Sequence, residues 1–199
     1  DALTLYDRII REDETNSTAR KRKVAVLRGQ RRYTDAIKEL TEYLQKFMSD
    51  GEAWQELVDL YLKEGDYGKA AFCMEELLLS NPHNAIYYTR FAEIKYTQGG
   101  LENMETAKTY FGHAMMLNPK NVRALFGLQL SCQQIACSGK ATSQKKKEAH
   151  RLAEFTAQQI KQRYDRVLGA SSSSADLVDS MYVSTMTCTD FCGSRVKVL

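Results

Sequence analysis

Histidine and cysteine are the residues of this sequence best suited to catalysis or metal binding, but their spacing forms no recognisable site. His83, His113 and His150 lie far apart in the sequence, with no triad or ligand spacing among them. Cys188 and Cys192 are separated by three residues, which is not the usual zinc or redox spacing, and no second pair or nearby histidine completes a tetrahedral site. The sequence therefore predicts no catalytic residues and no bound metal.

Phosphate-binding and nucleic-acid-binding signals are equally weak. Neither G-x-x-x-x-G-K-[ST] nor G-x-G-x-x-G occurs, and Gly99-Gly100 is better explained as a turn. Lysine plus arginine outnumber aspartate plus glutamate by 28 to 25, and the formal charge of +3 is too small to draw the chain onto nucleic acid or anionic lipid. We expect no cofactor, no small-molecule substrate, no nucleic acid partner and no enzymatic activity.

The cysteines and the lengths of the apolar runs indicate in which cellular compartment the protein works and whether it spans a membrane. An odd, scattered set of cysteines in a chain long enough to bury its own core differs from a secreted disulfide framework, so a reducing compartment is favoured. No run approaches the roughly 18 to 20 apolar residues that span a bilayer, and the first residues lack the basic start and apolar core of a signal peptide. We expect any membrane association to be peripheral, through a partner. The cysteines are Cys73, Cys132, Cys137, Cys188 and Cys192.

A helical repeat is the main structural signal in the chain. The composition is rich in Ala, Leu, Lys, Glu and Gln with only two prolines, which favours helix. Residues from Trp54 to Pro82 match the pattern of the tetratricopeptide repeat (TPR), a helix-turn-helix of about 34 residues. One period later, Tyr88, Phe91 and Ala92 match the same pattern. We therefore predict an all-α, TPR-type helix-turn-helix solenoid forming a right-handed superhelix. The first clear match consists of Trp54, Leu57, Tyr61, Gly65, Ala70 and Pro82.

Turn residues mark the boundaries of the predicted helices. Asn84 and Asn121 each precede the first helix of a repeat, where they can cap free backbone N–H groups. Pro82 and Pro119 close successive repeats and are 37 residues apart, about three more than the TPR period. We expect the additional residues to fall within Gly99–Asn103 and to lengthen a turn.

The repeat pattern divides the chain into two parts. Residues 1–168 form the predicted solenoid, with a partial first repeat and about four further repeats, and Ala2 and Ile9 indicate that the chain begins inside the second helix of a repeat. The last repeat is atypical, with a long second helix from about Ser143 to Val167. Residues 169–199 are a low-complexity linker and a tail of unknown structure, either disordered or extended along a partner or along the solenoid.

The concave surface of a TPR solenoid is lined mainly by the first helix of each repeat, and binding is expected there. Along the predicted surface the residues pass from basic through acidic to partly apolar, which suits a protein surface or an extended segment of mixed chemistry. An alternative for Leu62, Ile86 and Leu130 is burial by a neighbouring helix. The predicted partner-binding residues are Lys21, Arg28, Gln55, Asp59, Thr89, Glu93, Tyr96, Arg123, Phe126 and Leu130.

Some TPR domains clamp the C-terminal carboxylates of heat-shock chaperones with Lys, Asn, Asn, Lys and Arg spread over three repeats. This chain has Lys21 and Arg90 at two of those places, but Ala25, Glu56 and Ile86 stand at the others. Because Glu56 would repel a carboxylate, the sequence disfavours binding of a chaperone tail.

Three stretches go beyond the general TPR pattern: Ala53–Pro82, Tyr87–Glu93 and Leu117–Asn121. They closely resemble the family of subunit 2 of the endoplasmic reticulum (ER) membrane protein complex, and the resemblance covers roughly residues 1–167. It implies a soluble, non-catalytic TPR scaffold, peripheral on the cytosolic side of the ER membrane, in an insertase for tail-anchored and multi-spanning proteins. It implies as partners the eighth or the ninth subunit and the membrane-spanning subunits of that complex.

Two other classes of function remain open at this point. A stand-alone TPR adaptor that recruits a soluble chaperone or a short peptide would use the same groove. An enzyme would require a catalytic site that the sequence does not display.

Overall fold

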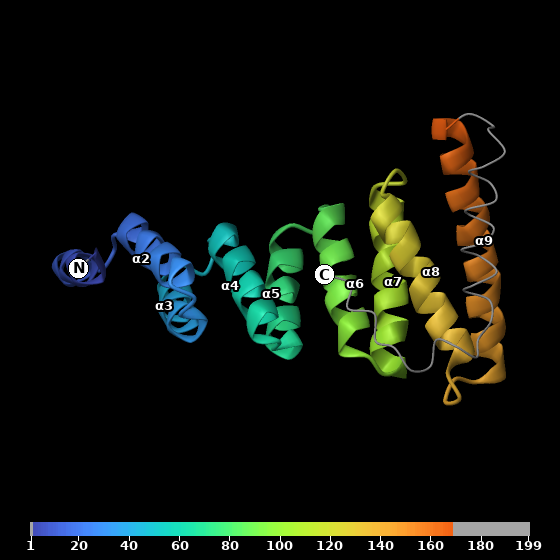
Figure 1. The fold of residues 1–199 in the computed structure, drawn as a ribbon, viewed down its shortest axis with the longest axis horizontal. Coiled ribbons are helices and arrows are strands. Elements are labelled where there is room, and N and C mark those ends of the chain that lie inside the picture. Colours follow the sequence, from blue (N-terminus) through green and yellow to red (C-terminus); the bar gives the residue numbers. More distant parts are fainter. Residues whose placement is uncertain (1, 169–199) are drawn as a thin grey trace. The chain divides into compact units, whose positions relative to one another are not determined.

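The computed structural model describes residues 2–168, which form nine α-helices and no strand. Within residues 2–82 and within residues 83–168, consecutive helices pack against each other and are joined by short turns, as a helical repeat requires (Figure 1). The predicted all-α, TPR-type fold is confirmed; the prediction for residues 169–199 lies outside the described residues. The helices are α1 (Ala2–Glu12), α2 (Ser17–Gly29), α3 (Tyr33–Lys46), α4 (Gly51–Glu64), α5 (Tyr67–Ser80), α6 (Ala85–Gln98), α7 (Leu101–Leu117), α8 (Val122–Cys137) and α9 (Ser143–Leu168).

The helices belong to two compact units. The first unit, Asp1–Pro82, contains α1 to α5, and the second, His83–Leu199, contains α6 to α9 among its described residues. Within the described part of the chain, no helix combines the length and the apolar character needed to cross a membrane.

Large and small apolar residues alternate in the core of the first unit. Leu40, Leu60 and Leu77 are fully buried between the helices, and each such side chain contributes about 1.5–3 kcal/mol by leaving water. Ala36 and Ala70, also fully buried, let neighbouring helix backbones approach closely. Ala70 also belongs to the repeat pattern found in the sequence, so at this position the pattern marks a residue of the core.

The second unit has a core of the same kind, built around two phenylalanines. Phe91 on α6 and Phe111 on α7 are buried together with Leu125 on α8. A Cβ atom added at Gly127 would lie only 2.4 Å from Phe111 Cε1 and Cζ. Glycine at this position on α8 therefore makes room for the Phe111 ring.

Side-chain caps begin the helices where the sequence places Asn and Asp. The Oδ1 atom of Asn84 accepts from the backbone N–H of Ile86, and that of Asn121 accepts from Ala124 N, as predicted. Between α4 and α5, Gly65 takes the left-handed conformation at φ 76° and Asp66 caps α5. Turn chemistry thus fixes where one helix ends and the next begins.

The prediction that additional residues lengthen a turn is wrong. The turn between α6 and α7 is only Gly99-Gly100, and α7 has 17 residues where α5 has 14. Leu101 and Met104 pack against the core of the second unit, and Asn103 Nδ2 donates to the Gly99 carbonyl at 2.8 Å. The extra residues form a further helical turn because their apolar side chains can cover the core.

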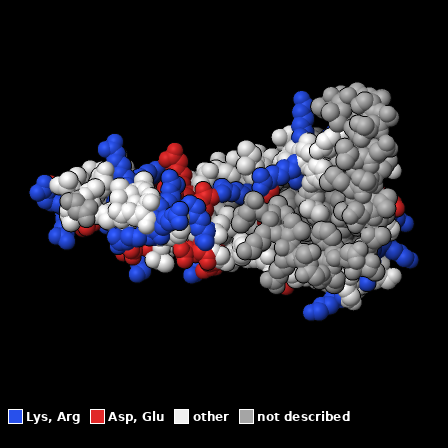
Figure 2. All heavy atoms as spheres, in the orientation of Figure 1, with Lys and Arg blue, Asp and Glu red and all other residues white. Residues whose placement is uncertain are grey.

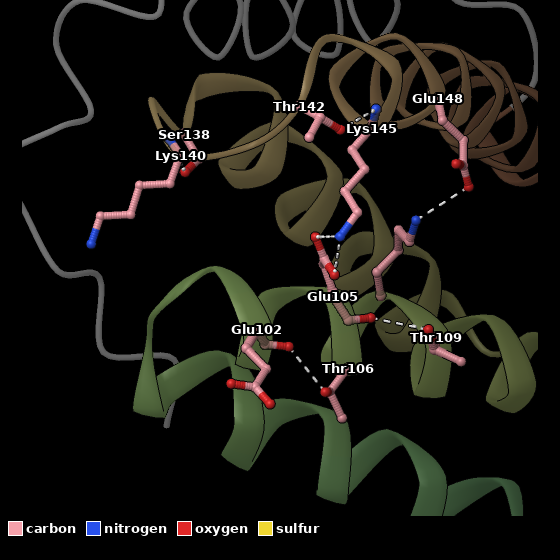
Figure 3. Close-up of polar contacts among 10 residues, drawn as sticks. Glu102, Glu105, Thr106, Thr109, Ser138, Lys140, Thr142, Lys145 and Glu148 are labelled. Carbon is pink, nitrogen blue, oxygen red and sulfur yellow. Dashed lines mark hydrogen bonds and ion pairs between the residues drawn. The ribbon is translucent and has the colours of Figure 1, made fainter.

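Two ion pairs connect α7 with the long terminal helix α9, which begins at Ser143 as predicted. Lys145 Nζ lies 2.7 Å from Glu105 Oε1, and Lys108 Nζ lies 3.3 Å from Glu148 Oε1 (Figure 3). The two pairs run in opposite directions, since each helix supplies one lysine and one glutamate. This arrangement favours one alignment of α9 on α7.

Candidate partner-binding surface

Five of the ten predicted partner-binding residues meet at one hollow in the second unit. They are spaced three or four residues apart on α6 and α8, so each helix presents them on one face. The cavity has a volume of about 180 Å³. Its lining consists of Glu93, Tyr96, Phe111, Arg123, Phe126, Gly127 and Leu130.

An ion pair lies at the edge of this α6–α8 hollow. Arg123 Nη2 donates to Glu93 Oε2 at 2.9 Å, and Arg123 Nε donates to Glu93 Oε1, so the pair is bidentate. The hydrogen bonds from Glu93 raise the pKa of the Arg123 guanidinium, which stays charged. The Arg123 side chain is still 66% exposed, so its remaining donors can reach a partner.

The apolar part of the hollow is made by Tyr96, Phe126 and Leu130. Tyr96 is half-buried, and burial raises the pKa of its hydroxyl group. The ring of Phe126 packs edge-on against Tyr164 of α9, with centroids 6.4 Å apart. Leu130 is half-buried, whereas Ile86 is 70% exposed, so burial by a neighbouring helix does not apply to Ile86.

Thr89, also predicted for this surface, lies inside the second unit. It is buried, its hydroxyl donates to the Ala85 carbonyl at 2.8 Å, and it accepts from Asn121 Nδ2 at 2.9 Å. These bonds connect α6 to the start of α8. Thr89 therefore holds the two helices that form the hollow.

The four remaining predicted residues lie on α2 and α4 of the first unit, where acidic and basic side chains are interspersed (Figure 2). Lys21 Nζ lies 2.7 Å from Asp50 Oδ2 and 3.0 Å from Glu52 Oε2. The hydrogen bond to Asp50 is the main cause that raises the pKa of Lys21. This surface is a set of matched charges rather than a basic region.

The other three residues of that set are similarly engaged. Arg28 Nη1 pairs with Glu56 Oε1 at 3.1 Å, and Gln55 Nε2 donates to the Gly51 carbonyl at 3.4 Å. Asp59 is half-buried on α4. Because Glu56 neutralises Arg28, a chaperone carboxylate would have to compete with the chain's own acidic side chains at this place.

A second hollow, which the sequence did not predict, lies in the first unit. This Trp54 groove has a volume of about 590 Å³ and runs between α3, α4 and α5. Trp54, Leu57 and Tyr61 belong to the repeat pattern, which gives no sign that they line an open groove. The lining residues are Thr41, Leu44, Gln45, Met48, Trp54, Leu57, Tyr61, Gly68, Lys69, Phe72 and Cys73.

Within residues 2–168 no group of three His, Cys, Asp or Glu side chains is placed to hold a metal ion. Cys73 and Cys132 are buried free thiols, and burial raises the pKa of Cys73 to about 12 and that of Cys132 to about 11. Neither carries appreciable thiolate at neutral pH, so neither is a ready nucleophile.

Solved structures of other proteins share the fold. The crystal structure of MamA matches with a TM-score of 0.60 and 13% identity over 82% of this chain and 89% of that one. A tetratricopeptide repeat protein from Parabacteroides merdae matches with a TM-score of 0.61 and 17% identity over 94% of this chain and 69% of that one. At these identities the likeness shows the fold alone.

Sequence relatives are more specific than the structural ones. ER membrane protein complex subunit 2-A of Xenopus laevis is 51% identical over 184 residues, covering 91% of this chain and 62% of the relative. Subunit 2 of Dictyostelium discoideum is 31% identical over 150 residues, covering 70% of this chain and 47% of the relative. The chain thus spans about 62% of the length of its Xenopus relatives.

A family model gives the same result for the N-terminal half. The model described as the EMC2 TPR-like repeat domain matches residues 1–101, just over half of the 199 residues. This chain therefore belongs to the EMC2 TPR-like repeat family, the family of subunit 2 of the ER membrane protein complex.

Proposed function

We propose that the chain is a non-catalytic TPR scaffold subunit of the ER membrane protein complex. The observation that carries the proposal is the 51% identity over 184 residues with a relative named as subunit 2 of that complex. Its proposed partners are the eighth or the ninth subunit of that complex, together with the membrane-spanning subunits. In this role the chain is peripheral on the cytoplasmic face of the ER membrane and supports an insertase for tail-anchored and multi-spanning proteins.

The α6–α8 hollow is the proposed anchor point for a partner subunit, and residues 1–168 are the proposed binding part of the chain. A cavity of about 180 Å³ lined by Tyr96, Phe126 and Leu130 suits an apolar side chain of the partner. Tyrosine and arginine are enriched among residues that dominate binding energy, especially where an apolar centre excludes water. Arg123 beside this centre can add a charge-assisted hydrogen bond to the partner.

The matched charges of the first unit suit a polar contact with a partner. Lys21, Arg28 and Asp59 lie on α2 and α4, where exposed charges affect the association rate and the choice of partner more than the affinity. The ion pairs of Lys21 and Arg28 within the chain would be exchanged for pairs with the partner, which keeps the net gain small.

The second candidate function is a stand-alone adaptor for a soluble chaperone or a short peptide. Its support is the same hollow, which is open to a single extended segment. Two features weigh against a chaperone tail: Glu56 already pairs with Arg28, and the exposed Ile86 offers no hydrogen bond to a carboxylate.

The test is affinity purification of the tagged chain from detergent-solubilised membranes, followed by mass spectrometry. Wild type is compared with a Tyr96→Ala, Phe126→Ala double variant and with Met116→Ala, whose side chain is 71% exposed on α7 away from the hollow. We expect wild type and Met116→Ala to recover the complex subunits and the double variant to lose them. Circular dichroism must show that each variant keeps its helical content.

The contrary outcomes are distinct. Recovery of soluble chaperones alone by the wild type would favour the adaptor. Full recovery of the complex by a folded double variant would remove the hollow from the interface while leaving the subunit assignment in place.

A further inference from the structure

The Trp54 groove of the first unit is preformed rather than a product of loose packing. Trp54 Nε1 donates to the Met48 carbonyl at 2.8 Å, and the Trp54 ring meets the Phe72 ring edge-on with centroids 6.5 Å apart. Leu44 and Leu57 are buried beneath them. Met48 and Phe72 remain more than half exposed, so the rim of the groove is apolar as well as its floor.

An exposed apolar groove of this size marks a binding surface. We propose that the Trp54 groove docks a short amphipathic helix of a partner protein, with its apolar side on Trp54 and Phe72 and an acidic side chain beside Lys69. This proposal concerns a surface separate from the α6–α8 hollow and does not depend on the proposed function.

The length of the groove fits two turns of helix. Trp54 and Tyr61 lie at its floor seven residues apart on α4, a distance of about 10 Å at 1.5 Å per residue. Apolar residues at positions i, i+3 or i+4, and i+7 of a docked helix span the same distance. The apolar face of a two-turn helix would therefore cover the floor from one end to the other.

The lining of the groove favours a helix over an extended segment. Apart from Met48, which lies in the turn between α3 and α4 and whose carbonyl accepts from Trp54 Nε1, the lining comes from α3, α4 and α5, where helical hydrogen bonds engage most backbone groups. An extended segment laid on Trp54, Leu57 and Phe72 would bury N–H and C=O groups without partners, which is unfavourable. A helix satisfies those groups internally and presents only side chains.

The charge of Lys69 determines the expected orientation of the docked helix. Lys69 alone is charged among the residues that line the groove in the described part of the chain. Its Nζ lies 5.5 Å from the centroid of the Tyr61 ring and 2.9 Å from Asp66 Oδ2, and the side chain is largely exposed. An ammonium group has three donors, so Lys69 can donate to a second carboxylate in addition to that of Asp66. Met48 lies by Trp54, and this end is uncharged.

The groove and the predicted partner-binding residues occupy different sides of α4. At about 100° per residue, Gln55 and Asp59 point well away from Trp54 and Tyr61. One partner on the predicted surface and a helix in the groove can therefore be bound at the same time.

Trp54 is the only tryptophan of the 199-residue chain, so its fluorescence reports directly on the groove. The probe is a synthetic amphipathic peptide of about 14 residues, four helical turns, with leucines at i, i+3, i+4 and i+7 and a glutamate after the last leucine. We expect saturable binding with a blue shift of Trp54 emission. A peptide of the same composition with a central proline should bind at least about tenfold more weakly, because it cannot stay helical.

A charge swap tests the orientation. Replacing the peptide glutamate by lysine should weaken binding about three- to tenfold, and Lys69→Glu in the protein should restore it. Phe72→Ala should weaken binding, whereas Met116→Ala and the Tyr96→Ala, Phe126→Ala variant should bind as wild type does, which separates this site from the α6–α8 hollow. Each protein variant is checked for unchanged circular dichroism.

Three results would overturn the proposal. They are equal binding of the proline peptide, no loss of binding in a folded Phe72→Ala variant, and a Trp54 shift produced by sodium laurate but not by the helical peptide. The last would identify the groove as a site for a small amphiphile instead.

Discussion

Asp50 both caps a helix and binds two other side chains. Its Oδ1 caps α4 by accepting from Glu52 N and Ala53 N, while its Oδ2 accepts from the Tyr43 hydroxyl and from Lys21 Nζ, both at 2.7 Å. Burial alone would raise the pKa of the Asp50 carboxyl, but the hydrogen bonds from Lys21 and Tyr43 outweigh burial and the pKa is lowered. The folded state therefore favours the charged form.

Replacing Asp50 by asparagine should separate the charge from the cap. Asparagine caps a helix as well as aspartate does, so Asp50→Asn should lose mainly the bond to Lys21 and about 1 kcal/mol of unfolding free energy at pH 7. Because the folded pKa is lowered, this contribution is complete above the unfolded value of about 4 and is lost as pH falls further. Urea titrations of both proteins at pH 7 and pH 3 should show the difference shrinking with acid.

Asp35→Asn provides the control for Asp50→Asn. Asp35 pairs with Arg32 at the surface, so its replacement should change stability by less than about 0.5 kcal/mol at either pH. A difference between wild type and Asp50→Asn that stayed constant from pH 7 to pH 3 would contradict the assignment of the effect to the carboxylate charge.

Two helical glycines should respond to alanine with opposite signs. At Gly127 a Cβ would meet the Phe111 ring at 2.4 Å, and both groups lie at the α6–α8 hollow, so Gly127→Ala should cost about 1–3 kcal/mol. At Gly112 nothing lies within 4 Å, so Gly112→Ala should stabilise α7 by about 0.5–1 kcal/mol. Thermal melting measures both, and equal signs would mean that Phe111 does not occupy the space assigned to it.

At the scale of elements, a buried polar contact joins α8 to α9. The Thr156 hydroxyl donates to Gln129 Oε1 at 2.9 Å, and both side chains are buried. Thr156→Val keeps the shape but leaves the Gln129 amide without this partner, so unfolding free energy should fall by about 1–3 kcal/mol. Thr156→Val combined with Gln129→Leu should recover part of that loss, as a double-mutant cycle by urea titration can show. Additive losses in the cycle would mean that the two groups do not interact.

Local rules predicted the helices well because the signals are local. The caps at Asn84 and Asn121 and the start of α9 at Ser143 follow from residue types next to the helix ends. The extra turn of α7 was missed because glycine marks a break but does not say whether the following residues find a core to cover. Leu101 does find one, and this depends on α6 to α9 packing together.

The sequence predicted only part of the binding surfaces, because contacts between helices also shape them. Repeat spacing was sufficient to gather Glu93, Tyr96, Arg123, Phe126 and Leu130, because their positions on α6 and α8 are fixed by the period. It could not reveal that Lys21 is held by Asp50 and Glu52, or that Trp54 lines an open groove. The ion pairs of Lys21 and the groove at Trp54 depend on which side chains meet and on gaps between helices. Sequence periodicity does not reveal these features.

At the scale of the whole chain, the division into two compact units has an energetic consequence. In repeat proteins each repeat contacts its neighbours only, so stability is a sum of local terms and need not be lost everywhere at once. Leu40 in the first unit and Leu125 in the second are both fully buried, and each belongs to the core of its own unit. They form a matched pair for testing how far a core defect spreads along the chain.

Leu40→Ala and Leu125→Ala should each lower stability by about 2–5 kcal/mol through the cavity left behind, but in different places. Native-state hydrogen exchange should show that Leu40→Ala reduces protection of amides in α2 to α5 while α8 and α9 keep theirs, and that Leu125→Ala does the reverse. An equal loss of protection in both units for either variant would show one cooperative unit instead. Local losses would mean that a partner bound at the α6–α8 hollow stabilises the second unit far more than the first.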